Sequence, residues 1–200
     1  MNIIYGIDLL GTMMFAISGA MAANRSGIDI FGATFTGFVT SIGGGSLRDV
    51  FLNLRPVWVD DANYLIAILV GVIISLIANR PLYRMARTLT FFDALGIGFF
   101  CIVGVQKSLT YESTTTAAVI LGVFSSVMGG VLRDTLMNET PLIFRKEIYA
   151  TACLSGAVLY IILGSCGLDT AVNAFISTLT VSAIRLISVK YRLALPGIGG

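Results

Sequence analysis

The sequence has 200 residues, of which 56% are hydrophobic and 12% are charged, and its mean hydropathy is +0.90. A soluble domain carries about 25% charged residues, so this composition indicates an integral membrane protein. The net charge of +2, spread between apolar segments, argues against nucleic-acid binding, and the absence of histidine argues against zinc or haem. We expect one membrane domain over residues 1–200 that is not an enzyme and needs no cofactor.

Apolar stretches separated by polar residues predict an all-α protein with seven membrane-spanning helices of about 20 residues each. In chain order the spans are expected over residues 3–23, 28–54, 62–78, 91–106, 114–137, 148–163 and 170–189. The first stretch has no basic segment before it and no clear cleavage signal, so we interpret it as a retained span and not as a signal peptide. The second and fifth spans are unusually long and contain glycine clusters that we expect to interrupt the helix.

The chain repeats itself at an offset of 85 residues without a gap. Between residues 8 and 78 the two copies share 21 identities in 71 positions. Each copy contains three spans, and because three is odd, the second copy must enter the membrane from the opposite side. The sequence therefore predicts an inverted 3+3 repeat, with repeat 1 at about 3–80, repeat 2 at about 90–165 and a seventh helix at about 169–189.

The positions of basic residues predict the orientation, because cytoplasmic loops carry an excess of lysine and arginine. The loop after the third span contains Arg80, Arg84 and Arg87. Placing this loop in the cytoplasm puts the N-terminus outside and the C-terminus inside a bacterial inner (plasma) membrane. The acidic residues 60–61 align with the basic residues 145–146 of the other copy, a reversal of charge that inversion of the same loop would require.

The strongest repeated motif is SIGGGSLRD at 41–49, which returns as SVMGGVLRD at 126–134. Adjacent glycines weaken a helix and can free backbone carbonyls, which are good ligands for a dehydrated cation. The alternative is that the glycines only allow helices to pack closely, as small residues do in membranes. On the first interpretation, the residues that shape or line a path for ions or a solute are Gly43, Gly44, Gly45, Gly129, Gly130, Thr40, Ser41, Ser125 and Ser126.

The charged residues of the repeat suggest two ion pairs that could act as gates or constrictions. Neighbours such as Arg48 and Asp49 lie about 100° apart around a helix and are expected to be poor partners. We therefore hypothesise one pair between Asp8 and Arg48 and its repeat counterpart between Asp93 and Arg133. The alternative is that both arginines reach the headgroups from the helix ends.

Three further charges have separate expected roles. Asp49 and Asp134 would attract cations to the path, and no metal is expected beyond the permeating monovalent cation. Lys107 has no charged counterpart, since it aligns with Ala22, and we expect it to extend to the membrane surface.

With its 3+3+1 spans and the strings GGGSLRD and GGVLRD, the chain resembles the prokaryotic TRIC family of trimeric intracellular cation channels. The resemblance implies a homotrimer in the membrane lipid, with one hourglass pore per protomer that passes monovalent cations, chiefly potassium. It also implies that the second and fifth spans are kinked at the glycines and line the pore. Animal members have a pore lysine shortly before the second glycine motif, where this chain has Val127 and Met128.

The residues alone are also compatible with a second function, the transport of a small solute. The same bacterial sequence group is also described as glycine transporters, and an inverted repeat is common in secondary transporters that work by alternating access. An arginine and an aspartate of the motif could bind the carboxylate and the amine of a small amino acid such as glycine.

Overall fold

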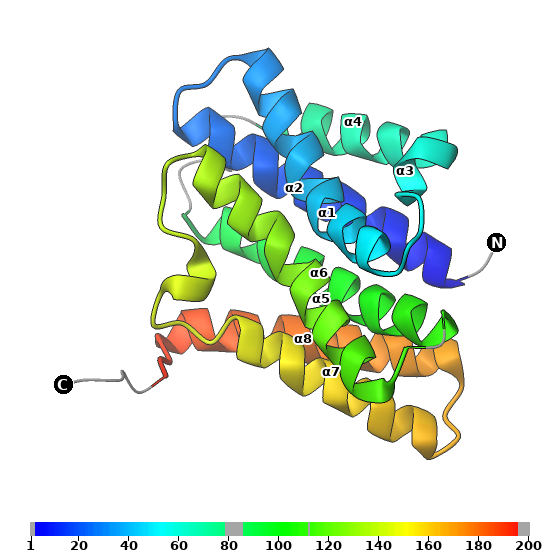
Figure 1. The fold of residues 1–200 in the computed structure, drawn as a ribbon. Helices are drawn as coiled ribbons and strands as arrows, with labels where there is room; N and C mark the ends of the chain where they lie inside the picture. Colours follow the sequence, from blue (N-terminus) through cyan, green and yellow to red (C-terminus); the bar gives the residue numbers. More distant parts are fainter. Residues whose placement is uncertain (1–2, 79–85, 112, 196–200) are drawn as a thin grey trace.

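The computed structural model describes residues 3–78, 86–111 and 113–195, and within these ranges the chain is helical with no strand. Seven long helices run back and forth, so that α1 begins and α8 ends at opposite ends of the bundle (Figure 1). The elements are α1 (Ile3–Arg25), α2 (Ile30–Phe51), α3 (Val57–Asp60), α4 (Ala62–Ile77), α5 (Ala86–Thr110), α6 (Thr115–Leu136), the 3-10 turn η1 (Leu142–Phe144), α7 (Ala150–Ser165) and α8 (Thr170–Tyr191).

Each of the seven predicted spans corresponds to one long helix, which confirms an all-α membrane fold. By length and composition, four described segments could cross a membrane, and these are α1, residues Thr88–Thr110 of α5, α6 and α8. The helices α4 and α7 are apolar but have only 16 residues each. Arg80 and Arg84, on which the predicted orientation depends, lie outside the described residues, as does the side chain of Arg87.

The duplication is visible in the local signals that begin and end the helices. The helices α2 and α6 occupy positions 85 residues apart and have 22 residues each. Their N-caps are also equivalent, since Asp29 accepts a hydrogen bond from the Gly32 amide and Thr114 accepts one from the Ala117 amide. Both helices are followed by an asparagine in the left-handed region, Asn53 with φ 56° and Asn138 with φ 55°, a conformation that asparagine tolerates better than most residues.

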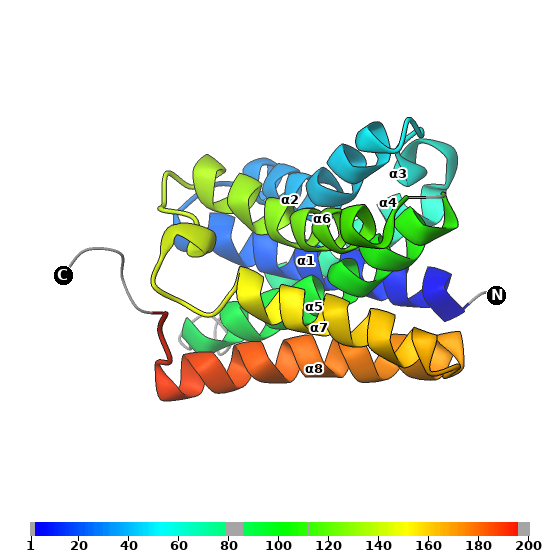
Figure 2. The same ribbon diagram turned by 60° about the horizontal axis from the view of Figure 1, so that its bottom comes forward.

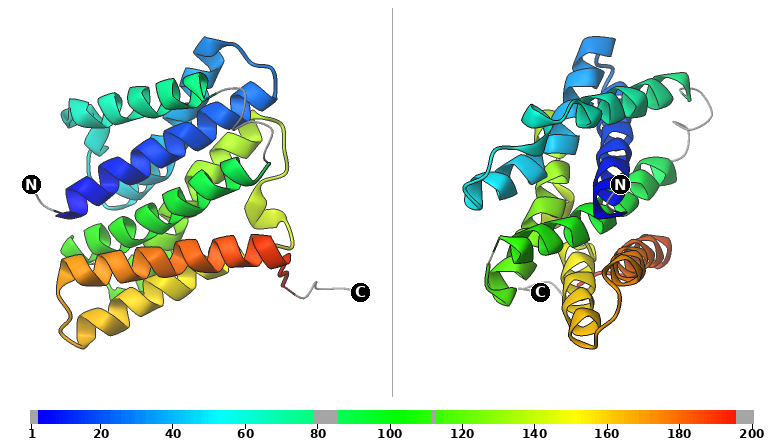
Figure 3. Two further views of the ribbon diagram at one scale, coloured as in Figure 1. Left: turned by 180° about the vertical axis from the view of Figure 1, so that it is seen from behind. Right: turned by 90° about the vertical axis from the view of Figure 1, so that its right-hand side faces the viewer.

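The four helices of the motif region, α1, α2, α5 and α6, form the centre of the molecule, with α4 on one side and α7 and α8 on the other (Figure 3). Glycines mark the closest helix approaches. A Cβ at Gly19 would lie 2.9 Å from the Cα of Gly37, and its repeat equivalent at Gly104 would lie 2.8 Å from the Cα of Gly122. Each repeat therefore pairs its first two helices through glycine, as closely packed membrane helices do.

The expectation that the glycine clusters interrupt the second and fifth spans is wrong for this structure. The backbone is α-helical throughout Gly43–Gly45 in α2 and Gly129–Gly130 in α6. A Cβ at Gly44 would lie 1.9 Å from the carbonyl oxygen of Ser125, and one at Gly129 would lie 2.4 Å from that of Thr40. These two glycines let the backbones of α2 and α6 meet, which is the packing role that the sequence left as the alternative.

Candidate functional site

The two Arg-Asp pairs lie near the C-terminal ends of α2 and α6, and these helices run in opposite directions (Figure 2). The pairs are therefore at opposite ends of the bundle, as an inverted repeat requires. We call the group around Arg48 the first centre (Asp8, Arg48, Asp49, Tyr64 and Lys107). The group around Arg133 is the second centre (Ser18, Asp93, Arg133 and Asp134).

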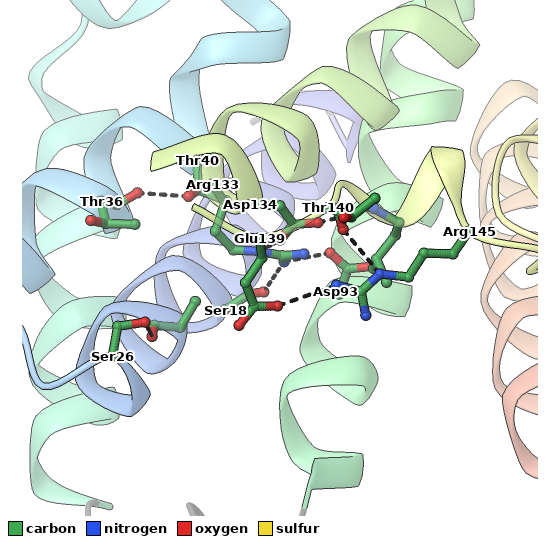
Figure 4. Close-up of polar contacts among 12 residues, drawn as sticks. Ser18, Ser26, Thr36, Thr40, Asp93, Arg133, Asp134, Glu139, Thr140 and Arg145 are labelled. Atoms are coloured by element: carbon green, nitrogen blue, oxygen red, sulfur yellow. Dashed lines mark hydrogen bonds and ion pairs between the residues drawn. The ribbon is translucent and has the colours of Figure 1, made fainter. Parts of the chain in front are cut away.

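In the second centre, one buried arginine joins three helices. Arg133 Nη1 donates to Asp93 Oδ1 of α5 at 2.6 Å and to Ser18 Oγ of α1 at 2.6 Å, while its Nε donates to Asp134 Oδ1 at 2.8 Å (Figure 4). Asp134 also accepts a hydrogen bond from the Leu142 amide at 3.1 Å. The contact between Asp93 and Arg133 that the sequence predicted is present, and the arginine is 1% exposed.

In the first centre, the partners differ from those predicted. Arg48 donates from Nε and Nη2 to Asp49 Oδ1 at 3.0 and 2.8 Å, and Lys107 Nζ lies 2.9 Å from the same oxygen. Asp8 instead accepts a hydrogen bond from the Tyr64 hydroxyl at 2.8 Å. The predicted ion pair between Asp8 and Arg48 is wrong, because the two side chains form no contact within salt-bridge distance.

Two assumptions caused that error. Neighbouring helix positions point about 100° apart, but the arginine side chain is long enough to reach the adjacent carboxylate, and both Arg48 and Arg133 bind the next residue. A buried charge needs a partner within reach, and the adjacent carboxylate supplies it. Lys107 was expected to extend to the membrane surface, yet it is only 18% exposed and binds Asp49 across helices.

Each centre borders a cavity. The first centre borders one of about 10 Å³, close to the size of a single water molecule. The polar residues of its lining are Asp8, Thr12, Ser41, Ser46, Arg48, Trp58 and Tyr64. The second centre opens into a larger cavity of about 230 Å³. Its charged lining comprises Arg25, Arg133, Asp134, Glu139, Arg145, Glu147 and Arg185.

The predicted hydroxyl residues are buried where α2 and α6 meet. Thr40 and Ser41 donate to carbonyl oxygens four residues earlier in α2, both at 2.6 Å. Ser126 donates to the Val123 carbonyl at 2.8 Å. Ser125 Oγ has no hydrogen-bond partner in the described part of the chain, and Ser41 borders the small cavity of the first centre.

Several polar atoms in or beside the two centres lack a hydrogen-bond partner within the described ranges. Among the described side chains, eight buried nitrogen or oxygen atoms are unpaired, and they include Arg48 Nη1, Asp49 Oδ2, Asp93 Oδ2 and the Tyr149 hydroxyl. Such groups are rare in folded proteins and need a specific explanation. Two of the four are carboxylate oxygens, which favour a cation as partner. No group of three or more acidic, cysteine or histidine side chains able to hold a metal occurs in the described ranges.

Sequence reasoning missed Arg185 of α8, which is 1% exposed and lies beside the second centre. Its Nη2 is 2.7 Å from Glu147 Oε2, and its guanidinium lies 5.0 Å from the ring centre of Tyr149. The available signal was an arginine within the last apolar span. Because α8 lies outside the repeat, aligning the chain with itself could not reveal it.

Comparison with known families and sequences agrees with the duplication. The family model described as "Glycine transporter" matches residues 5–80 and again residues 90–165, segments that begin 85 residues apart. A "UPF0126 membrane protein" of Vibrio cholerae is 36% identical over 197 residues, which are 98% of this chain and 82% of the relative. The "UPF0126 inner membrane protein YadS" of Escherichia coli K12 is 36% identical over 199 residues, which cover 97% of this chain and 95% of the relative.

Two solved structures share the fold over nearly their whole length. The TRIC trimeric intracellular cation channel orthologue from Rhodobacter sphaeroides has a TM-score of 0.89 and 32% identity, covering 96% of this chain and 100% of that one. A prokaryotic TRIC channel crystallised in 0.5 M KCl has a TM-score of 0.86 and 27% identity, covering 96% of this chain and 98% of that one. These relatives are described as membrane proteins and channels, not as enzymes.

Proposed function

The chain belongs to the TRIC family, and from that membership we propose that it is a monovalent-cation channel that prefers potassium. The solved relatives are described as cation channels. The observation that carries the proposal is the presence of a charged centre at each end of the same four helices, α1, α2, α5 and α6. Each centre holds a buried carboxylate with one unpaired oxygen, on Asp49 and on Asp93.

The proposed path lies within one protomer and connects the two cavities. One solved relative is described as a trimeric channel, which supports a homotrimer, and the proposal gives each subunit its own pore. Negative side chains near a pore raise the local concentration of cations. The motif glycines would shape this path by holding α2 and α6 in contact, and Asp49, Asp93 and Asp134 would attract the ion.

Reconstitution in planar bilayers under a potassium gradient tests the channel. Unitary currents that reverse near the potassium equilibrium potential are expected. With equal concentrations of potassium on one side and sodium on the other, the reversal potential should shift from zero in the direction that a preference for potassium requires. Empty bilayers and bilayers that contain an unrelated membrane protein are the controls. A protein that is folded and inserted but carries no unitary current under any gradient would contradict the proposal.

Secondary transport of a small amino acid is the second candidate, and the description of the matching family model favours it. Alternating access would require one repeat to move against the other around a closed site. The same reconstituted vesicles distinguish the two functions. Saturable uptake of labelled glycine, without unitary currents, would replace the channel by a transporter.

We further propose that the protein lies in the bacterial inner membrane with its N-terminus outside and its C-terminus in the cytoplasm. One relative is described as an inner membrane protein. Arg25 at the end of α1 and Lys190 in the last turn of α8 are basic, and Arg145 borders the same cavity as Arg25. Fusions to the C-terminus test this placement. A green fluorescent protein fusion should fluoresce and a periplasmic alkaline phosphatase fusion should be inactive, and the opposite pattern would reverse the orientation.

A further inference from the structure

Tyr64 of α4 and Tyr149, which precedes α7, are equivalent positions of the two repeats, 85 residues apart. In the first centre Tyr64 donates a hydrogen bond to Asp8. In the second centre the equivalent aspartate, Asp93, binds Arg133 instead. We propose that tyrosine and arginine compete for this aspartate in each centre, and that the two centres show the two outcomes of the exchange. The proposal goes beyond the proposed function, because such an exchange can serve a channel or a transporter.

The unpaired arginine nitrogen of the first centre has a paired counterpart in the second. Arg48 Nη1 is buried without a hydrogen-bond partner among the described residues. The equivalent nitrogen of Arg133 donates to Asp93 Oδ1 and to Ser18 Oγ, both at 2.6 Å (Figure 4). A guanidinium nitrogen that is buried without an acceptor is costly. Arg48 is therefore in the position of an arginine whose aspartate, Asp8, is occupied by another donor.

The unpaired tyrosine and carboxylate atoms of the second centre have paired counterparts in the first. The Tyr149 hydroxyl and Asp93 Oδ2 are buried and make no hydrogen bond within the described ranges. Their equivalents, the Tyr64 hydroxyl and Asp8 Oδ2, bind each other at 2.8 Å. A Cβ at Gly130 would lie 2.6 Å from the Tyr149 hydroxyl oxygen and 3.7 Å from Asp93 Oδ1. Both side chains thus border the same point, and a local rotation is enough to join them as in the first centre.

A third difference involves the segment that follows each Arg-Asp pair. Asp134 Oδ2 accepts a hydrogen bond from the Leu142 amide at 3.1 Å. The equivalent Asp49 Oδ2 is unpaired in the described part of the chain, although Val57, the counterpart of Leu142, borders the small cavity. Each of these four unpaired atoms therefore has a repeat equivalent that is paired. One change of partners accounts for all of them, which four unrelated packing defects would not do.

The cavities indicate which arrangement is wide and which is narrow. The centre in which tyrosine binds the aspartate borders a cavity of about 10 Å³, whereas the centre in which arginine binds it opens into one of about 230 Å³. Asp8, Arg48 and Tyr64 all border the small cavity. A change of partner among these three side chains therefore reshapes that cavity directly. The tyrosine-bound arrangement is the narrow state of a centre, and the arginine-bound arrangement is the wide state.

Ser18 explains why the second centre is the one in the arginine-bound state. Its hydroxyl accepts a hydrogen bond from the same nitrogen of Arg133 that binds the aspartate. The repeat counterpart of Ser18 is Val103, which has no hydroxyl to offer Arg48. The arginine-bound state thus has one more hydrogen bond in the second centre than it can have in the first, so the sequence biases the two centres toward opposite states.

Thiol labelling at the small cavity tests the exchange in the first centre. The reporter is Ser41→Cys, which borders this cavity, in a background whose three native cysteines are replaced. A membrane-impermeant reagent is applied to spheroplasts or inverted vesicles, whichever exposes the first centre. Tyr64→Phe removes the donor to Asp8 and should raise the labelling rate about tenfold, the effect of losing one hydrogen bond to a charged group. Adding Arg48→Lys should abolish this increase, because lysine lacks the second nitrogen needed to bind Asp8 and Asp49 together.

Tyr160→Phe is the matched control for Tyr64→Phe. The Tyr160 hydroxyl donates to Gln106, and the residue is 4% exposed. The control therefore also removes a hydrogen bond from a buried tyrosine, but away from both centres. It should leave the labelling of Ser41→Cys at its original rate. Thermal unfolding in detergent checks that each variant is folded.

A rescue experiment tests the exchange in the second centre. Ala22→Cys borders the large cavity and reports how accessible it is. Arg133→Lys weakens the arginine-bound state, so the Tyr149 hydroxyl should bind Asp93 and the labelling rate should fall about tenfold. Adding Tyr149→Phe should restore the rate, although this hydroxyl has no partner among the described residues. Simple damage to the packing around Arg133 would not be repaired by removing a second polar group.

The labelling rates do not depend on ion flux, so they test the exchange whether or not the reconstituted protein carries current. If Tyr64→Phe opens the first centre and also slows labelling of Ala22→Cys, the exchange stands and the two centres alternate, as in a transporter. The exchange is wrong if Tyr64→Phe leaves labelling unchanged or if its effect persists with Arg48→Lys. It is also wrong if Arg133→Lys has no effect, or an effect that Tyr149→Phe does not reverse.

Discussion

Gly44 and Gly45 are neighbours in α2, but the structure gives them different surroundings, and this difference can be tested by adding one methyl group to each. A Cβ at Gly44 would lie 1.9 Å from the carbonyl oxygen of Ser125 in α6. A Cβ at Gly45 would find its nearest neighbours at 3.7 Å, an ordinary contact distance. Gly44→Ala must therefore push α2 and α6 apart, whereas Gly45→Ala fits into the existing space.

The expected difference in stability follows from two opposing effects. Alanine favours a helix over glycine by about 1 kcal/mol, which applies equally to both positions. Overpacking in a well-packed interior typically costs about 1–3 kcal/mol, and backbone that cannot move aside places Gly44→Ala at the upper end. We expect Gly45→Ala to be neutral or slightly stabilising and Gly44→Ala to lie roughly 3 kcal/mol below it in free energy of unfolding.

Thermal unfolding of the purified protein in detergent measures this difference. For a chain of this size about 1 kcal/mol corresponds to about 2–4 °C, so the midpoints of the two variants should differ by roughly 6–12 °C. Gly129→Ala, the repeat equivalent of Gly44→Ala, should resemble it because its Cβ would lie 2.4 Å from the Thr40 carbonyl oxygen. Equal midpoints for Gly44→Ala and Gly45→Ala would refute the close contact between α2 and α6.

The charged centres give three further predictions. Asp93→Ala removes a partner from the buried Arg133 and should lower the free energy of unfolding by about 3 kcal/mol, measured by denaturation in detergent, with Lys107→Met as the contrast. Lys107→Met should lower the free energy of unfolding by about 1 kcal/mol or less, because the amine is partly exposed and Asp49 keeps its ion pair with Arg48. A larger loss would show that Lys107 is essential to the first centre. Asp134→Asn should reduce potassium flux in vesicles, and unchanged flux and selectivity would remove this carboxylate from the mechanism.

The sequence predicted the architecture well because each helix carries its own signals. The seven spans were visible as apolar stretches, and the repeat fixed the direction of the second copy. The N-caps Asp29 and Thr114 and the left-handed Asn53 and Asn138 occur at the same offset, so local signals and the duplication agree. A short helix, α3, was not predicted, because four residues are too few to produce a periodic pattern.

The side-chain contacts were harder to predict, because they depend on how far a flexible side chain can turn. The contact between Asp93 and Arg133 was correctly inferred from the inverted repeat. The contact between Asp8 and Arg48 was inferred from the same symmetry and was wrong, although both aspartates and both arginines are equivalent in sequence. Symmetry of sequence therefore did not ensure symmetry of pairing.

The difference between the centres follows from residues that lie outside the duplicated pattern. Lys107 aligns with the uncharged Ala22. Asp49 therefore has a second cation beside Arg48, whereas Arg133 is the ion-pair partner of Asp134 among the described residues. Near the second centre, Arg185 lies over the ring of Tyr149, whose hydroxyl has no hydrogen-bond partner among the described residues, whereas the equivalent Tyr64 donates to Asp8. Asp93 therefore pairs with Arg133, whereas its repeat equivalent Asp8 pairs with Tyr64. Two equal sets of charges acquire different contacts because one lysine and one arginine were added asymmetrically, and an ion would meet a different arrangement of charges at each end of the path.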